Sequence, residues 1–325
     1  MNTLNLREEK SPNGFKDHKG YSRIFQKGKL TFGFIAPIEN YPHGPLPTME
    51  NHEKMIRRAD LAGISALWLR DVPFLDPNFG DAGQIFDPLV YAGWLAGITK
   101  ELTIGTAGVV LPLRDPLIVA KQAASIDQLL KGRFILGLAS GDRRSEYPAF
   151  GVNFENRASR YRDALNIITQ VTENTYPTYR SDYYGQLEGD IDLVPKPFHK
   201  RLTKIAIGRS GQNIEWIAEH MDGWIWHGID ARRMADIVPQ WNAANKGIYK
   251  PYGYATWFEL SKDPDEPLQP GRILKAGRNT LIKFWKEQET AGISHVALNL
   301  KPSQRSAEET LDELAEYVLP FFPSH

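Results

Sequence analysis

The chain has 325 residues, of which 42% are hydrophobic, and its 39 lysine and arginine residues balance 39 aspartate and glutamate residues. This neutrality argues against a surface that binds nucleic acid or an anionic membrane. The sequence contains no cysteine, which excludes disulfides, thiolate catalysis and cysteine-ligated metals. Residues 1–20 lack the apolar core of a signal peptide, and no apolar run is as long as a membrane span, so we expect a cytoplasmic protein.

Strands and helices alternate along the chain from residue 30 onward. We interpret residues 1–28 as a mobile or surface-wrapping arm and residues 29–325 as a single domain. Short apolar runs rich in β-branched residues predict the strands, which are expected at residues 30–35, 66–69, 102–111, 134–138, 204–207, 223–226, within 253–260 and at 295–300. Apolar residues at helical spacing predict the helices, which are expected at residues 48–62, 87–99, 118–130, 156–172, 214–220, 231–244, 279–291 and 307–321. Eight such alternations fit a (β/α)8 barrel better than an open doubly wound sheet, which usually has fewer strands.

One segment interrupts this alternation. Residues 174–203 contain tyrosines, glycines and three prolines without a helical pattern. We expect an insertion before the fifth strand, with a short hairpin at residues 183–185 followed by an extended segment. Pro239 lies inside the helix expected at residues 231–244 and predicts a kink or a break there.

Residues 102–151 contain the clearest local pattern. After the strand at residues 102–111, Asp115 can cap a helix whose first turn suits Pro116, and Gly132 suits its end. A second short strand follows the glycine. Strand, helix and strand in this order form a βαβ unit with parallel strands.

Three stretches of this unit resemble the bacterial luciferase-like monooxygenase family: IGTAGVVLPLRDP, DQLLKGRFILGLASGD and EYPAFG. The resemblance extends more weakly from about residue 30 to about residue 320. It implies a luciferase-like (β/α)8 TIM barrel that binds a flavin. In such barrels the active site lies at the C-terminal ends of the strands, so the residues that follow each predicted strand are the candidates.

A glycine-rich turn joins the fifth predicted strand to the next helix. Glycine allows the backbone to approach an anion closely, and free N–H groups favour its binding. The alternative is an ordinary strand–helix turn in which Ser210 or Asn213 caps the helix. The resemblance implies that this turn holds the flavin phosphate, through Gly208, Arg209, Ser210, Gly211, Gln212 and Asn213.

The resemblance also implies a second phosphate contact, from an arginine just after the fourth strand. This sequence has Ser140 at that position, followed by Gly141. Arg143 is therefore the candidate substitute for the missing arginine.

Small residues near the end of the third predicted strand leave room for a flat ring. The resemblance implies that the flavin ring lies over Thr106, Ala107 and Gly108, where the family has a non-proline cis peptide bond or a bulge. We assign the cis bond to Ala107–Gly108. The alternative is a buried strand whose small residues serve the packing of the barrel.

Two more candidates end predicted strands. Ala36 follows the first strand, and Trp226 ends the sixth. The resemblance implies an aromatic residue near the flavin at the position of Trp226, and the alternative is a core tryptophan.

Asp71 ends the second predicted strand, at a position where the resemblance implies a catalytic histidine in the luciferases proper. We keep two interpretations of Asp71: a general base, or a structural ion pair with Arg70 or Arg143. Because the histidine is replaced, light emission and the aldehyde substrate are not expected. His227 follows the sixth strand and is the second candidate catalytic residue. The histidines form no HExxH or other metal-binding pattern, so we expect no metal site.

The sequence and the resemblance together predict a flavin-dependent oxidoreductase, and more specifically a two-component monooxygenase. The resemblance implies that reduced FMN, which comes from a separate flavin reductase or is formed with NAD(P)H, reacts with O2 to give a peroxyflavin that oxidises a small organic substrate. Two alternatives remain open: a deazaflavin-dependent hydride-transfer enzyme, and a flavin-binding protein without turnover. The second and third predicted helices carry many small or apolar residues, and the resemblance implies dimers formed through this side of the barrel, so we expect a homodimer.

Overall fold

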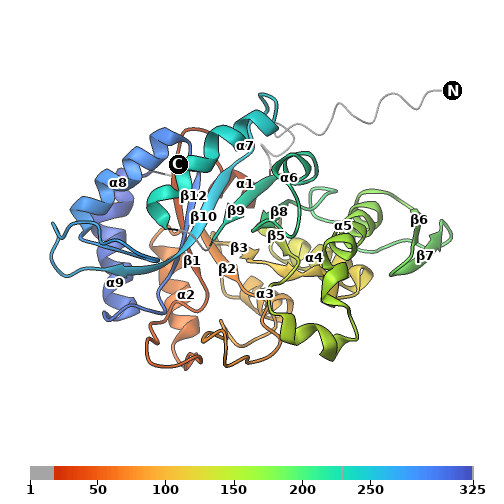
Figure 1. Ribbon diagram of the computed structural model, residues 1–325, viewed down its shortest axis with the longest axis horizontal. Helices are drawn as coiled ribbons and strands as arrows, with labels where there is room; N and C mark the ends of the chain where they lie inside the picture. Colours follow the sequence, from red (N-terminus) through yellow and green to blue (C-terminus); the bar gives the residue numbers. More distant parts are fainter. Residues whose placement is uncertain (1–17, 228–229, 324–325) are drawn as a thin grey trace.

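The structure is a computed structural model and describes residues 18–227 and 230–323. Eight parallel strands form a closed ring, because the last strand pairs with the first and the two remaining edge strands pair with each other (Figure 1). This ring confirms the predicted (β/α)8 barrel. In ring order the strands are β1 (Thr31–Ile35), β2 (Ala66–Leu69), β3 (Thr103–Thr106), β5 (Phe134–Ala139), β8 (Lys204–Ile207), β9 (Gly223–Trp226), β10 (Tyr252–Leu260) and β12 (His295–Asn299).

Helices surround the ring on its outer side (Figure 1). Asp87 and Asp115 accept hydrogen bonds from the first turns of α3 and α4, and a proline begins each of these helices. The break predicted at Pro239 lies between a short 3₁₀-helix and α7, whose first turn contains this proline. No helix within residues 18–227 and 230–323 is long and apolar enough to cross a membrane. The main helices are α2 (His52–Leu61), α3 (Pro88–Ala96), α4 (Pro116–Leu129), α5 (Arg157–Glu173), α6 (Ile214–His220), α7 (Val238–Ala244), α8 (Arg278–Ala291) and α9 (Ala307–Glu313).

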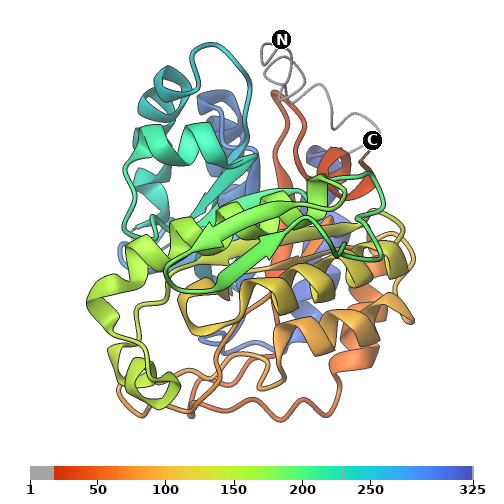
Figure 2. The same ribbon diagram turned by 90° about the vertical axis from the view of Figure 1, so that its right-hand side faces the viewer.

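The insertion before the fifth barrel strand forms the predicted hairpin. Its strands, β6 (Thr178–Ser181) and β7 (Gly185–Glu188), pair in antiparallel fashion beyond α5 (Figure 1). In Figure 2 the molecule is turned so that this hairpin lies toward the viewer. The strand predicted at residues 102–111 is broken in two: after β3, the short β4 (Val109–Val110) pairs with β5. The short strand β11 (Ile273–Ala276), which extends the sheet beside β10, was not predicted.

Residues 18–28 do not form the expected surface arm. They include α1 (Lys19–Ile24), whose backbone N–H at Gly20 donates to the carbonyl of Gly132 at the start of β5. The helix closes the N-terminal end of the barrel, where three of the segment's side chains are buried among inward-facing residues: Tyr21, Ile24 and Phe25. Because this segment contains so few apolar residues, its sequence shows no helical periodicity. Residues 1–17 lie outside the described residues, and the division into arm and domain stays a prediction.

A chain of hydrogen bonds crosses the closed end of the barrel. The Trp68 indole N–H donates to Nε2 of His295 at 2.9 Å, so the proton of the neutral imidazole lies on Nδ1. This Nδ1 is 2.8 Å from Oγ1 of Thr31, whose hydroxyl donates to the carbonyl of Ile24 in α1 at 2.7 Å. The indole of Trp68, both ring nitrogens of His295 and the hydroxyl of Thr31 are thereby all hydrogen-bonded while His295 stays uncharged.

This histidine makes stability depend on pH. Burial lowers the pKa of His295 from 6.5 to about 3. Between these two pKa values the unfolded chain binds a proton at this histidine and the folded chain does not. The free energy of unfolding therefore falls as the pH falls below 6.5, by about 1.4 kcal/mol per pH unit for one group. We expect urea denaturation between pH 7 and pH 4 to show this loss. His295→Gln should reduce the slope of the unfolding free energy against pH by the amount that corresponds to about one bound proton. His43→Gln, a substitution of an exposed histidine, should leave this slope unchanged. An unchanged pH dependence in His295→Gln would contradict the assignment.

Candidate functional site

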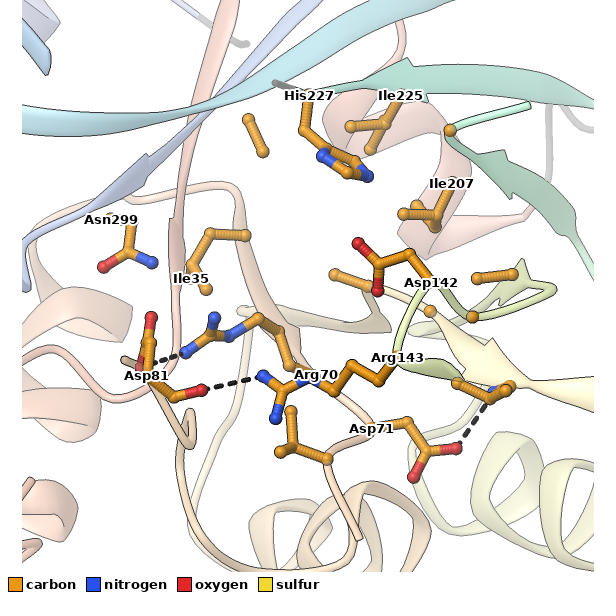
Figure 3. A pocket seen from close by; sticks show the side chains of 18 of the residues that line it. Ile35, Arg70, Asp71, Asp81, Asp142, Arg143, Ile207, Ile225, His227 and Asn299 are labelled. Carbon is orange, nitrogen blue, oxygen red and sulfur yellow. Dashed lines mark hydrogen bonds and ion pairs between the residues drawn. The ribbon is translucent and has the colours of Figure 1, made fainter. Parts of the chain in front are cut away.

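A cavity of about 580 Å³ opens at the C-terminal ends of the barrel strands (Figure 3). This is the end at which barrel enzymes bind their ligands, and the volume suits a cofactor or small molecule. The predicted site residues that line the cavity are Asp71, Ala107, Gly108, Ser140, Gly141, Arg143, Gly208, Arg209, Ser210 and His227. The predicted residues that do not line it are Ala36, Thr106, Gly211, Gln212, Asn213 and Trp226.

The wall beneath β3 and β4 is built from small residues. The Ala107–Gly108 peptide bond is cis, as predicted. A Cβ atom at Gly108 would lie 2.8 Å from Cγ1 of Ile207 and 3.0 Å from the carbonyl oxygen of Gly137, so a larger residue does not fit without displacing its neighbours. Thr106 lies outside the cavity because its Oγ1 donates to the carbonyl of Gly137 at 2.7 Å. It holds this segment against β5 instead of facing a ligand.

The turn after β8 has left-handed backbone at Gly208, Ser210 and Gly211, with φ values of 65°, 52° and 71°. Alternation of right- and left-handed residues forms a concave backbone surface whose N–H groups can bind an anion. Oγ of Ser210 accepts a hydrogen bond from the backbone N–H of Ser140 at 3.0 Å, which joins the ends of β5 and β8. Arg209 lies within the same turn and lines the cavity. This part of the turn can receive a phosphate.

The second half of the turn supports its shape and does not line the cavity. The amide of Gln212 donates to the carbonyl of Ala158 in α5 at 3.2 Å, and Asn213 caps the first turn of α6. A Cβ atom at Gly211 would lie 2.9 Å from Cβ of Ala158. The expectation of direct ligand contact was therefore wrong for these side chains, because the turn directs them toward α5 and α6.

Asp71 belongs to a buried ion pair at the end of β2. Its side chain is 2% exposed, and Arg114 donates to its two oxygens at 2.8 and 2.6 Å. The backbone N–H of Val110 donates to the same carboxylate at 2.9 Å, and Arg114 also pairs with Asp87 at 2.6 Å. These three donors favour the structural ion pair over the general base. The partner differs from the two arginines that we considered, because it comes from the loop after β4.

Two arginines meet at Asp81, in the loop of residues 72–86 (Figure 3). Nη2 of Arg70 is 2.8 Å from Oδ1 of Asp81. Burial alone would raise the pKa of this carboxyl group, but the Arg70 guanidinium holds it below its usual value. Arg143 donates to the backbone carbonyl of Asp81 at 2.8 Å, and its guanidinium carbon is 4.7 Å from the ring centre of Phe79. Arg143 therefore turns toward this loop, and no described contact joins it to the turn after β8, where we expected a second phosphate contact.

His227 and Asp142 both point into the cavity (Figure 3). His227 keeps some exposure to solvent at the mouth, yet the surrounding protein lowers the pKa of its imidazole by desolvation. The nearby Asp142 carboxylate acts in the opposite direction and raises it. The imidazole is consequently neutral at pH 7 and able to accept a proton.

Ala36 and Trp226 face away from the cavity. Successive residues of a strand point to opposite faces, and the cavity is lined by their neighbours, Ile35 and Ile225. Ala36 packs in the outer core between strands and helices, and Trp226 lies under the guanidinium of Arg209, 5.2 Å from the ring centre. The sequence does not show this because strands buried on both faces lack an alternating pattern.

Several lining residues were not among the predicted site residues, and those used below are Asn299, Trp257, Phe79, Arg272 and Asp142. Asn299 ends β12, and Asp142 follows β5, so a polar residue at the end of an apolar strand was the available signal. Among residues 18–227 and 230–323, no cluster of three or more histidine or acidic side chains is arranged to hold a metal ion.

Comparison with known proteins identifies the relatives of this chain. The alkanal monooxygenase beta chain of Photorhabdus luminescens is 31% identical over 157 residues, which cover 48% of this chain and 48% of that one. The chain spans about half the length of the first curated relatives it matches. Among solved structures, the monooxygenase RslO1 from Streptomyces bottropensis has a TM-score of 0.74 at 14% identity, covering 90% of this chain and 100% of that one. An F420-dependent secondary alcohol dehydrogenase in complex with an F420-acetone adduct has a TM-score of 0.73 at 18% identity, covering 91% and 99%.

These structural neighbours share the fold, and the sequence match carries the family assignment. The model of the luciferase-like monooxygenase family matches residues 30–255, which include the cis peptide segment and the turn after β8. The chain belongs to the luciferase-like monooxygenase family.

Proposed function

We propose that this protein is a flavin-dependent monooxygenase that uses reduced FMN and O2 to oxidise a small organic substrate. The supporting observation is a single wall of the cavity that combines two features. Ala107 and Gly108 leave the backbone open to a flat ring, and the turn after β8 offers the N–H groups of Arg209 and Ser210 and the Arg209 side chain to a phosphate. The N–H of Gly208 donates to the carbonyl of Ile225 at 2.9 Å instead. The hydrogen bond between Ser140 and Ser210 holds the turn after β8 against the end of β5, and β4, which follows Gly108, pairs with β5.

The residues present fit such a cofactor. Side chains are absent at Gly108, Gly141 and Gly208, and at Gly208 an added Cβ would come within 3.4 Å of Nε2 of His227. A bound reduced flavin supplies the electrons for the reaction with oxygen, while the protein supplies orientation and a site that excludes water. We assign to the neutral His227 the role of accepting a proton from the substrate. Asp71 holds the cavity wall through Arg114.

A deazaflavin-dependent hydride transfer without oxygen is the alternative function. The observation in its favour is that an alcohol dehydrogenase with a similar fold binds coenzyme F420. Such an enzyme would share the barrel and the ring site with a flavin monooxygenase. A flavin-binding protein without turnover is the remaining possibility.

The test combines binding with oxygen consumption. Reduced FMN and reduced coenzyme F420 are titrated anaerobically in parallel, and oxygen uptake with candidate substrates is then followed by an electrode while a separate flavin reductase supplies reduced FMN. We expect selective binding of FMN and substrate-dependent oxygen uptake with formation of an oxygenated product. Preference for coenzyme F420 without oxygen uptake would transfer the assignment to hydride transfer.

We also propose that the protein is a homodimer. Apolar side chains are exposed on the neighbouring helices α3 and α4, with 69% of Val90, 40% of Trp94 and 58% of Ile118 accessible. A second copy of the chain is the occupant that a self-complementary apolar face favours. Light scattering at micromolar concentration should give twice the chain mass. Val90→Glu combined with Ile118→Glu should give the monomer, and Ile191→Glu, in the insertion, should not. A monomeric wild-type protein would contradict the proposal.

A further inference from the structure

The cavity has two walls of different chemistry. The strands β3, β5 and β8 follow one another in the ring and provide the small residues of the proposed cofactor site. The opposite part of the ring, made by β10, β12, β1 and β2, contributes larger and more polar side chains. We call this second part the substrate wall. Its residues used in the argument are Asn299, Trp257, Arg272 and, from the loop after β2, Phe79. Arg143 follows β5, but its guanidinium reaches across to this loop and is counted with the substrate wall.

Asn299 offers a donor to the cavity. Its side chain is 6% exposed, and its Oδ1 accepts a hydrogen bond from the backbone N–H of Lys301 at 3.0 Å. Because that backbone group can only donate, the oxygen of the amide is fixed on this side. The two hydrogens on Nδ2 have no acceptor among residues 18–227 and 230–323, while Asn299 lines the cavity. A nearly buried amide with free donors favours a ligand that accepts hydrogen bonds.

Guanidinium groups add positive charge to the same wall. The charge of Arg70 is compensated by Asp81, at 2.8 Å. Arg143 contacts only carbonyl oxygens and the face of Phe79, although the carboxyl groups of Asp76 and Glu146 act on it from behind the wall.

Arg272 is the least compensated cation of the substrate wall. It lines the cavity, and in the described parts of the chain no carboxylate lies within ion-pair distance of it. Asp142, which points into the cavity, follows β5 on the other wall. Together with the amide of Asn299, this charge favours an anion.

Two aromatic side chains lie at the cavity with much of their surface uncovered. Phe79 is 41% exposed, and Trp257 is 43% exposed, although both are large apolar groups. Phe79 comes from the loop of residues 72–86 and Trp257 from β10, so two separate elements place aromatic surface at one opening. Exposed aromatic surface beside charged donors is typical of a binding site for a flat apolar group.

We propose that the substrate wall binds an aromatic carboxylate, with its ring against Trp257 and Phe79 and its carboxylate at Asn299 and Arg272. This inference gives the substrate class for the proposed monooxygenase and rests on that function for the oxidation step alone. Binding itself requires only the wall. An uncharged aliphatic aldehyde satisfies neither the guanidinium group nor the aromatic surface.

The test separates ring from charge with four probes: benzoate, benzyl alcohol, octanoate and octanal. Their binding is measured by calorimetry on the full-length protein, with and without FMN. We expect benzoate to bind most tightly. Arg272→Gln and Asn299→Asp should each weaken benzoate binding by about tenfold and leave benzyl alcohol unchanged, because each removes a contact to the charge. Asn299→Asp keeps the oxygen that accepts a hydrogen bond from the backbone N–H of Lys301. Arg180→Gln, which removes a charge from the exposed hairpin, is the matched control for Arg272→Gln.

The outcomes distinguish this inference from the proposed function. Tightest binding of octanal or benzyl alcohol, or undiminished benzoate binding in Arg272→Gln, would overturn the aromatic carboxylate even if FMN binds and oxygen is consumed. Selective benzoate binding that depends on Arg272 in a protein without affinity for FMN would support the substrate wall and reject the flavin function. Because Arg272 is exposed, its variant is expected to fold normally.

Discussion

Replacing Arg114 by methionine is expected to lower the free energy of unfolding by about 3–5 kcal/mol, because it leaves the carboxylate of Asp71 buried without its cation. The Asp71 side chain is 2% exposed, and Arg114 supplies two of its three hydrogen bonds. Methionine keeps most of the apolar stem, so the change isolates the charge. Urea denaturation at pH 7 measures the effect. Reduced FMN should also bind less tightly, since Asp71 holds the N–H of Val110 close to the cis peptide bond.

A second variant shows whether the loss comes from the stranded charge. The combination Asp71→Asn with Arg114→Met removes both charges while keeping the size of the aspartate. It should be more stable than Arg114→Met alone, as expected for two residues that interact directly. A loss below about 1 kcal/mol in Arg114→Met would instead be typical of a solvent-exposed ion pair and would remove this pair from the account.

Gly137→Ala should destabilise the barrel by about 3 kcal/mol or more, because its new methyl group has no space. A Cβ atom at this position would lie 1.7 Å from the carbonyl oxygen of Thr106 and 3.1 Å from Cγ1 of Ile207. The first of these atoms belongs to the backbone and cannot move aside as a side chain does. The strands β3 and β5 must therefore separate, and the bond from Oγ1 of Thr106 to the carbonyl of Gly137 is lost. Thermal denaturation followed by circular dichroism measures the effect.

Gly93→Ala is the matched control for this substitution. Gly93 lies in α3, its φ is not positive, and no atom comes within 4 Å of an added Cβ. Alanine should therefore stabilise the protein by about 0.5–1 kcal/mol through its better helix propensity. If both alanine variants had similar stability, the close approach of β3 and β5 would be wrong.

The barrel was predictable because its signals are local. Asp115 and Pro116 begin α4, the apolar run of β5 follows it, and the same strand–helix alternation recurs along the chain. The cis bond at Ala107–Gly108 was predicted from the resemblance, not from local physics. α1 was missed because its few apolar residues are buried only by contact with the end of the barrel, which is formed by residues distant in the sequence.

The details of the site depend on contacts between distant parts of the chain. Asp71 and Arg114 are 43 positions apart, and nothing in the sequence near either residue selects this partner. Trp226 was placed near the ligand because the resemblance implies an aromatic residue there. Both faces of β9 are apolar, so only the three-dimensional structure shows that Ile225 points inward. Asn299 was missed although it is a polar residue that ends the apolar strand β12, the same signal that marks Asp71 after β2.

The central claim is that the turn at Gly208–Ser210 holds the phosphate of a flavin whose ring lies on Ala107–Gly108. The most direct measurement compares the anaerobic affinities for reduced FMN and reduced riboflavin, which lacks the phosphate, in the wild type, Arg209→Gln and the surface control Arg233→Gln. We predict that the wild type and the control prefer FMN by at least about tenfold, the scale of one charge-assisted contact, and that Arg209→Gln loses most of this preference. Equal affinity for the two flavins in the wild type, or binding of neither, would contradict the account.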